Sequence, residues 1–229
     1  MESLTIEIFE VRASLYGLLA KCLFSEPSLE TLREIEEQVS SLREKIGIWD
    51  EPELKTGFQN FLDALARSNP EKLAVDYAGL FLGGKEGSIC PSESSYVEKI
   101  VYGQSTLKVI EFYAQYGFIK DETFHEPDDH IAVEFVFMSV MGWNFFEMIR
   151  GGRMESSDYR NHLEPQLNFL TDHLMKWIPA WATHVRESSE TDFYRTLVKF
   201  SQTLVEADYQ LLRDTLRIIQ DHPRIKTLN

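Results

Sequence analysis

The sequence predicts an all-α fold, a single globular domain of about ten helices with a hinge linker between two halves. Apolar residues recur at intervals of three and four over most of the chain, which is the period of an amphipathic helix. No stretch of useful length alternates apolar and polar residues as a half-buried strand does. The 229 residues are 43% hydrophobic, so the chain can bury a sizeable core.

The first half of the chain is expected to be helical between turns that contain proline or glycine. Ser28 is the predicted N-cap of the second helix, because its hydroxyl can accept a hydrogen bond from a free backbone N–H. Pro52 and Pro70 open the third and fourth helices. The predicted helices of this half cover residues 4–24, 28–46, 52–65, 70–82, 97–104 and 105–116.

The second half follows a polar linker of roughly ten residues, 118–128, which contains Pro127. We expect a hinge near 118–129 within one domain that covers residues 1–229. Pro165 predicts a kink or break in the helix it occupies, and Pro179 is expected to restart the chain. His162, His173 and His184 are interpreted as surface or capping residues. The predicted helices of this half cover residues 131–149, 156–177, a short segment with Trp181 and Val185, and 191–220.

The central feature is the segment from Glu126 to His130 and the apolar run that follows it. Pro127 biases Glu126 toward an extended or turn conformation. Asp128 or Asp129 can then cap the next helix and favour its positive end. That helix is apolar nearly all round, which predicts the buried central helix of the domain. A charged turn is therefore expected at the start of the most buried element.

Net charge limits the partners that this chain can bind. Lysine and arginine total 23 against 37 aspartate and glutamate residues, which gives a formal charge of −14. Such a surface repels nucleic acid and anionic membranes and attracts a basic peptide. Cys22 and Cys90 form no C-x-x-C pair, which argues against a disulfide framework and fits a reducing cytoplasm.

Neither the N-terminus nor the longest apolar run predicts a targeting or membrane sequence. Residues 1–7 have no basic region and no continuous apolar stretch, so no signal peptide is predicted. Residues 131–149 are long enough to span a membrane, but Glu134 and Glu147 would each cost about 2.5–3.5 kcal/mol there. A buried helix and no stable membrane insertion are therefore expected.

Enzyme motifs are missing from the sequence. It contains no G-x-S-x-G, H-E-x-x-H, phosphate loop or dinucleotide fingerprint. A metal-dependent helical enzyme remains an alternative, because Asp129, His130 and Glu134 include an i, i+4 pair that can bind a divalent ion. Otherwise no catalytic activity, no metal and no cofactor is predicted.

Three short motifs occur in order between about Tyr77 and Met138. They are Y-A-G-L-F from Tyr77, P-S-E-S-S-Y from Pro91, and E-P-D-D-H from Glu126, the last before the long apolar helix. Together they resemble the Y-x-x-L-F, P-x-E-S-x-Y and E-P-x-D-H motifs of the TorD/DmsD/NarJ family. These are cytoplasmic maturation chaperones for molybdenum-containing redox enzymes of anaerobic respiration.

The resemblance implies a cytoplasmic chaperone that binds the N-terminal, twin-arginine type leader of a molybdoenzyme catalytic subunit. It also implies assistance to insertion of the molybdopterin cofactor, delayed export, and a monomer or a domain-swapped dimer. A non-exported client, such as a nitrate reductase catalytic subunit, is the alternative. An apolar groove with an acidic rim suits a basic and apolar peptide. The candidate leader-binding residues are Tyr77, Phe81, Pro91, Glu93, Ser94, Tyr96, Glu126, Pro127, Asp128, Asp129 and His130.

Overall fold

The computed structural model describes residues 6–83, 88–152 and 156–221, and this part of the chain contains helices and no strand. A single isolated bridge joins Ser92 to His130. The helices are α1 (Glu7–Phe24), α2 (Leu29–Lys45), η1 (Ile46–Ile48), α3 (Pro52–Ala66), α4 (Pro70–Phe81), α5 (Glu93–Val97), α6 (Gln104–Gln115), α7 (Ile131–Arg150), α8 (Ser156–Phe169), η2 (Leu170–Leu174), α9 (Met175–Ser188) and α10 (Asp192–Asp221). The predicted all-α class is confirmed.

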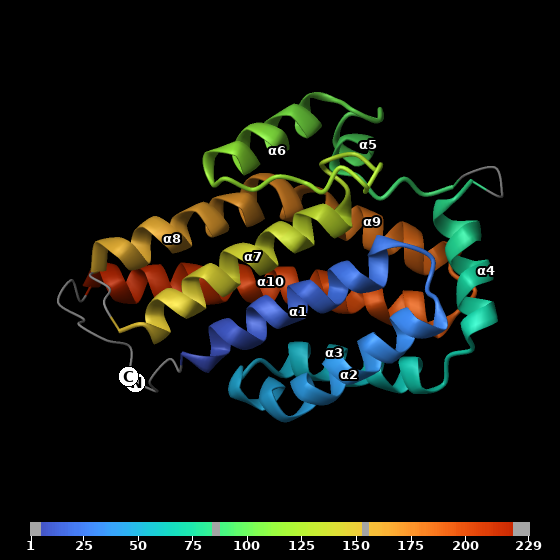
Figure 1. The fold of residues 1–229 in the computed structure, drawn as a ribbon, viewed down its shortest axis with the longest axis horizontal. Helices are drawn as coiled ribbons and strands as arrows, with labels where there is room; N and C mark the ends of the chain where they lie inside the picture. The colour runs from blue at the N-terminus through green and yellow to red at the C-terminus, as the bar shows by residue number, and fades with distance from the viewer. Residues whose placement is uncertain (1–5, 84–87, 153–155, 222–229) are drawn as a thin grey trace.

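Helices α1 and α7 pack along each other in the middle of the molecule (Figure 1). They approach closely because a small residue stands at the contact. A Cβ atom at Gly142 would lie only 2.9 Å from the Cβ of Ala13. The Ser139 hydroxyl donates a 2.9 Å hydrogen bond to the Ala13 carbonyl oxygen. This pair joins the first half of the chain to the second.

Helix α7 is the described helix whose length and apolar composition would suit a membrane span. About 67% of its most apolar window is buried inside the protein. Glu134 has no exposed surface and lies among the core residues. This burial agrees with the predicted central core helix.

The remaining helices surround this pair. Helix α10 packs against α3, α8 and α9, whereas α2 packs on α1. Helices α5 and α6 form a separate layer along one edge, and the linker runs beside α6 back toward α5 (Figure 1). This layer carries the second of the three motifs.

Several predicted helix ends agree with the structure. The Ser28 side chain caps α2 by accepting a 3.0 Å hydrogen bond from the Thr31 backbone. Pro52 and Pro70 occupy the first turns of α3 and α4. The linker 118–128 contains no helix. The predicted start at Leu4 and the predicted stops at Gly84 and His222–Pro223 lie outside the described residues.

The predicted helix at 97–104 is wrong. A single helical turn, α5, occurs one turn earlier, and residues 98–103 form a loop. Lys99 and Tyr102 have left-handed backbone angles, with φ of 62° and 60°. Non-glycine residues rarely adopt this conformation, so side-chain contacts must hold the loop in place.

The prediction at Pro165 was a kink or a break, and the helix does not break there; the predicted restart at Pro179 is wrong. Residues 156–188 are helical throughout, with the π-helical turn η2 between α8 and α9. A proline removes one backbone donor from a helix. Burial of Trp177, Ile178 and Trp181 in the core outweighs that loss at Pro179.

Candidate functional site

The turn before α7 is built differently from the prediction. His130, and neither Asp128 nor Asp129, is the N-cap of α7. The Nδ1 atom of His130 accepts a 3.2 Å hydrogen bond from the Ala132 backbone N–H. Asp129 cannot cap α7 because its carboxylate turns toward another segment of the chain. The predicted caps, Asp128 or Asp129, lie within two residues of the observed cap but are the wrong side chains.

Asp129 joins the second motif to the third. Its Oδ2 atom accepts a 2.7 Å hydrogen bond from the backbone N–H of Ser94 at the start of α5. The Glu93 N–H donates to the Asp129 carbonyl oxygen at 3.0 Å, and the Ile131 N–H donates to the Pro91 carbonyl oxygen at 2.8 Å. These bonds surround the Ser92–His130 bridge. Two motifs more than thirty residues apart therefore form one structural unit.

Beneath this unit lies a buried polar chain. The Glu93 Oε2 atom is 2.7 Å from Nδ1 of His173. The indole N–H of Trp177 donates to Oε2 of Glu134 at 3.2 Å. Burial raises the pKa of Glu134 well above its ordinary value, and the neighbouring charges of Glu93 and Asp129 raise it further. A proton on Glu134 relieves that repulsion.

His173 corrects the sequence interpretation, because it is buried and is not a surface or capping residue. It lies in the π-helical turn η2, which places it toward Glu93. The sequence did contain a sign of this burial, because His173 lies near the apolar residues Leu170, Leu174 and Trp177 on the same helix. The other two predicted surface histidines, His162 and His184, are partly exposed and exposed.

Burial divides the eleven predicted site residues into two groups. Glu93, Ser94, Asp129 and His130 are at most 3% exposed, so they cannot directly meet a peptide in this conformation. Pro91, Pro127 and Tyr77 are buried as well. The more accessible members are Phe81, Tyr96, Glu126 and Asp128.

The aromatic residues of the predicted groove lie in two places. Tyr77 and Phe81 pack edge to face with ring centroids 5.1 Å apart, and both contact Tyr194. Burial raises the pKa of Tyr77 to about 12, and the negative charges of Glu126 and Glu26 contribute. Tyr96 instead packs on Trp177 at 5.6 Å, away from that cluster.

Tyr96 has a polar contact at its exposed end. Its hydroxyl is 3.1 Å from Nδ1 of His184 on α9. Burial of the rest of the side chain raises the pKa of Tyr96 above its ordinary value. Tyr96 therefore links α5 to α9, while Trp177 beneath it reaches Glu134.

The linker is held by specific contacts. The Lys120 ammonium group is 3.5 Å from Oδ2 of Asp128 and also donates to the Glu126 carbonyl oxygen. Phe124 stacks on Phe24 of α1, with ring centroids 4.1 Å apart. The Tyr113 hydroxyl donates to the Asp128 carbonyl oxygen at 3.3 Å. The carboxylate of Asp128 and the backbone at Glu126 therefore have defined positions.

The metal-site alternative does not fit this geometry. Within residues 6–83, 88–152 and 156–221, no group of three or more histidine, cysteine or acidic side chains is placed to hold a metal ion. His130 uses Nδ1 to cap α7, and Asp129 uses Oδ2 to bind Ser94. These two atoms are occupied by hydrogen bonds that cap α7 and join the second motif to the third, so they do not point toward a shared metal site.

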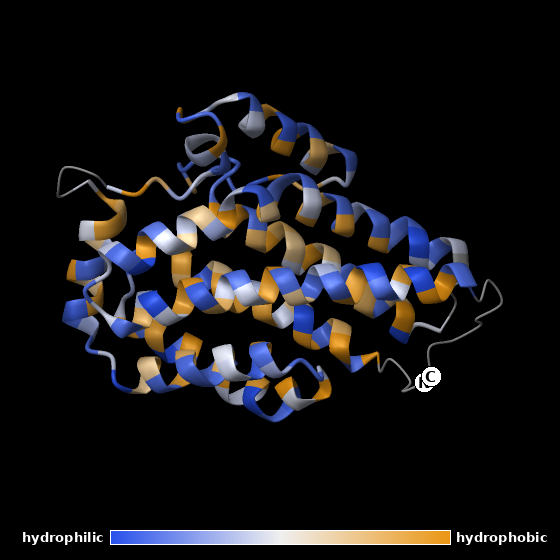
Figure 2. Cartoon of the chain, turned by 180° about the vertical axis from the view of Figure 1, so that it is seen from behind, coloured by the Kyte–Doolittle hydropathy of each residue, from blue (hydrophilic) through white to orange (hydrophobic). Residues whose placement is uncertain are grey.

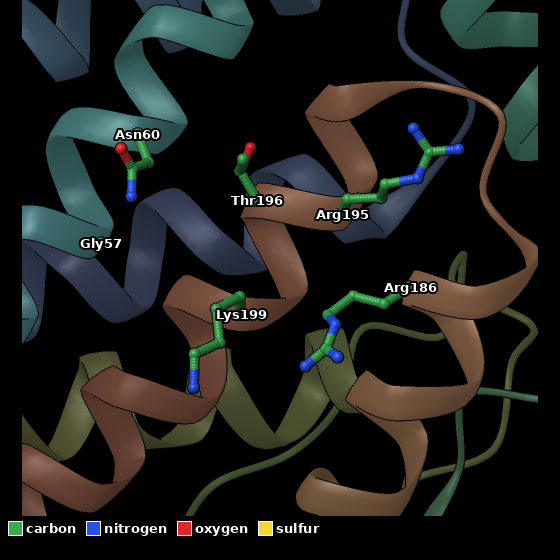
Figure 3. A pocket seen from close by; sticks show the side chains of 6 residues that line it. All are labelled: Gly57, Asn60, Arg186, Arg195, Thr196 and Lys199. Carbon is green, nitrogen blue, oxygen red and sulfur yellow. The ribbon is translucent and has the colours of Figure 1, made fainter.

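A pocket of about 330 Å³ lies where α3, α9 and α10 meet. Its lining includes Arg186, Arg195 and Lys199 (Figure 3). The charged ends of Arg186 and Lys199 point to the same side, whereas that of Arg195 turns away (Figure 3). Like charges repel, so this pocket is unsuited to the basic residues of a leader.

Comparison with known proteins agrees with the motifs. The sequence profile of a family described as nitrate reductase delta subunit matches residues 50–183. A chaperone protein TorD of Vibrio cholerae is 24% identical over 210 residues, covering 89% of this chain and 92% of the relative. The TorD chaperone of Photobacterium profundum is 28% identical and covers 89% and 94% of the two chains.

A solved structure is also similar. It is a putative redox enzyme maturation protein from Archaeoglobus fulgidus, 25% identical, with a TM-score of 0.47. The match covers 87% of this chain and 93% of the other.

The family match and the TorD relatives define a chaperone of the TorD type, a class of proteins without enzymatic activity. The chain belongs to the nitrate reductase delta subunit family, whose profile spans more than half of it.

Proposed function

We propose that this chaperone binds the twin-arginine type N-terminal leader of the catalytic subunit of a molybdopterin-containing oxidoreductase. It holds that subunit in the cytoplasm until the cofactor is inserted, and so delays export. The observation that carries this proposal is the set of TorD chaperones that align with nearly the whole chain. The formal charge of −14 supports a basic partner and disfavours nucleic acid and membrane surfaces.

The accessible members of the predicted site are proposed to contact the leader. Glu126 and Asp128 carry carboxylates that can pair with arginine guanidinium groups, a charge-assisted and geometrically specific bond. Phe81 and Tyr96 offer partly exposed aromatic surface.

The buried members are proposed to position this surface. Asp129, Glu93 and Ser94 join α5 to the turn before α7. Pro91 and His130 belong to the same set of backbone bonds and caps, and Pro127 precedes them. Loss of one of these residues would alter leader binding through the shape of the site.

Calorimetric titration with a synthetic twin-arginine leader tests the proposal. Wild-type protein should bind with a Kd of roughly micromolar or tighter, and salt should weaken the binding. A leader whose two arginines are replaced by glutamine should bind more weakly. Glu126→Gln and Asp128→Asn should reduce the difference between the two leaders, whereas Glu37→Gln on the exposed face of α2 should leave it unchanged.

Three results would contradict parts of the proposal. No binding of leaders from several molybdoenzymes would remove the proposed function. Binding that does not distinguish the two leaders would remove arginine pairing. An equal effect of Glu37→Gln would show that only the overall charge matters.

A non-exported client is the second candidate, favoured by the description of the matching family as a nitrate reductase delta subunit. Its N-terminal segment would lack the arginine pair. Tighter binding of such a segment than of any twin-arginine leader would favour this candidate.

A further inference from the structure

The layer formed by α5 and α6 exposes an unusual number of apolar side chains. Six of them fall within fourteen residues of sequence: Val97 at 46% exposed, Ile100 at 57%, Val101 at 46%, Tyr102 at 65%, Leu107 at 52% and Ile110 at 40%. We call this set the 97–110 surface. Single exposed apolar residues are ordinary, but a cluster indicates an interaction site.

The loop within this surface is held in one conformation. Oε1 of Glu98 accepts hydrogen bonds from the Ser105 backbone N–H at 2.8 Å and from its hydroxyl at 2.7 Å. A Cβ atom at Gly103 would lie 1.6 Å from the other carboxylate oxygen of Glu98. Lys99 and Tyr102 are left-handed on either side of Ile100 and Val101. The chain therefore accepts backbone strain while its apolar side chains face solvent.

Helix α6 extends the surface and anchors it. Its inner face carries Phe112 and Tyr113, and both rings pack on Phe137 and Phe169. Leu107 and Ile110, three residues apart, share the exposed face. The α5–α6 layer carries apolar positions, coloured orange, in Figure 2. The inner contacts fix the helix, so its outer face is available to a partner.

Lys99 and Lys108 are exposed within this surface, but more acidic than basic side chains accompany it. Glu98 lies in the loop, Glu111 is exposed on α6, and Asp121, Glu122 and Glu126 are exposed on the linker beside α6 (Figure 1). An apolar surface beside carboxylates complements a peptide that has basic residues followed by an apolar segment.

We propose that the 97–110 surface binds the apolar segment of the client's leader, while carboxylates on the linker pair with the basic residues that precede it. This inference rests on the proposed function. It assigns the apolar segment of the peptide to a surface that lies outside all three motifs. Six side chains are fewer than the roughly 20–30 residues a side of a standard protein interface, which favours a peptide over a second copy of the chain.

The test combines two proteins with two leaders in calorimetry. The double variant Leu107→Ser, Ile110→Ser removes apolar side chains that are already exposed, so the fold should persist. It should bind the leader about tenfold or more weakly than the wild type. A leader whose apolar segment carries serines should bind the wild type more weakly but lose little further affinity with the variant. The control Val75→Ser, Leu82→Ser removes two side chains that are 68% and 60% exposed elsewhere.

The outcomes separate this inference from the proposed function. A wild type that binds no leader overturns both. Leader binding that is unchanged in the α6 double variant, or weakened equally in the control, overturns this inference alone. A wild-type dimer that becomes monomeric in the double variant with unchanged leader affinity would assign the surface to a second copy instead, which also overturns it. Circular dichroism of both variants verifies that the fold is retained.

Discussion

Arg12 has no exposed surface and lies at the contact of three helices. Its guanidinium group forms an ion pair with Asp208 of α10 and donates a 2.6 Å hydrogen bond to Oε1 of Gln166 on α8. The Tyr16 hydroxyl completes the arrangement by donating to Asp208 at 2.8 Å. Burying two charges is favourable only when they are paired and hydrogen-bonded, so each partner depends on the other.

Arg12→Met should lower the free energy of unfolding by about 3–5 kcal/mol, because Asp208 is left buried without its counter-charge. Urea denaturation followed by tryptophan fluorescence measures this change. Adding Asp208→Leu should recover part of the loss. Lys21→Met, which breaks an exposed ion pair with Glu34, should cost less than about 1 kcal/mol. If Arg12→Met lowered the free energy of unfolding no more than Lys21→Met does, this account would be contradicted.

His130 makes stability depend on pH. Burial, aided by the charge of Lys120, lowers its pKa to about 3. A histidine in the unfolded chain titrates near 6.5. The contribution of neutral His130 to the free energy of unfolding is therefore complete above pH 6.5 and is lost as the pH falls toward 3. His130→Asn keeps an acceptor for the cap and does not titrate. When the pH falls from 7 to 5, the free energy of unfolding of the wild type should decrease by about 2 kcal/mol more than that of this variant.

The same urea titration at both pH values gives the measurement. His125→Asn is the matched control, since His125 is exposed and stays in water in both states. Equal acid sensitivity of the wild type and His130→Asn would show that His130 is not the titrating group.

At the scale of elements, the loop between α5 and α6 shows how side chains hold an irregular segment. Glu98 supplies the acceptors for the first turn of α6. Gly103 leaves room for that carboxylate. The sequence predicted a helix over 97–104, and the bonds between Glu98 and Ser105, seven residues apart, hold a loop there instead.

Gly103→Ala should displace Glu98 and cost about 1–2 kcal/mol, comparable to the loss of a helix cap. It should also weaken leader binding if the 97–110 surface takes part. Thermal unfolding and calorimetry measure the two effects. Gly79→Ala on α4 is the control, because nothing lies within 4 Å of its added Cβ. That variant should be neutral or stabilising by roughly 0.5–1 kcal/mol. Unchanged stability at Gly103 would contradict the cap assigned to Glu98.

At the scale of the whole molecule, the linker joins halves that share one core. Helix α1 packs on α7, and α3 packs on α10, so both contacts cross the linker. The resemblance implies that such halves can exchange between two chains, and the same contacts would be remade in a swapped dimer. We therefore expect the core to hold the two halves together even when the linker is cut.

A protease site inserted at Ile119, which is 87% exposed, tests this expectation. After cleavage, the fragments should elute together in gel filtration at micromolar concentration and separate only in denaturant, because the buried apolar area that joins them is intact. An uncut sample with the same insertion is the control. Separate elution of folded fragments would show two independent domains.

The sequence by itself determined the features that depend on neighbours within one or two turns. Periodicity located α1, α2, α7 and α10, and Ser28 was identified as a cap, because side-chain to backbone bonds at a helix start join residues two or three apart. The three motifs identified the family. The physical reason is that helix formation and capping are local.

Only the tertiary structure decided which side chains meet. Asp129 looked free to cap α7 but binds Ser94, and His173 looked exposed but pairs with Glu93, eighty residues away. Helix α9 continued through Pro179, beside the buried side chains of Trp177, Ile178 and Trp181. In each case a contact between distant residues, or burial in the shared core, was worth more than the local preference that the sequence displays.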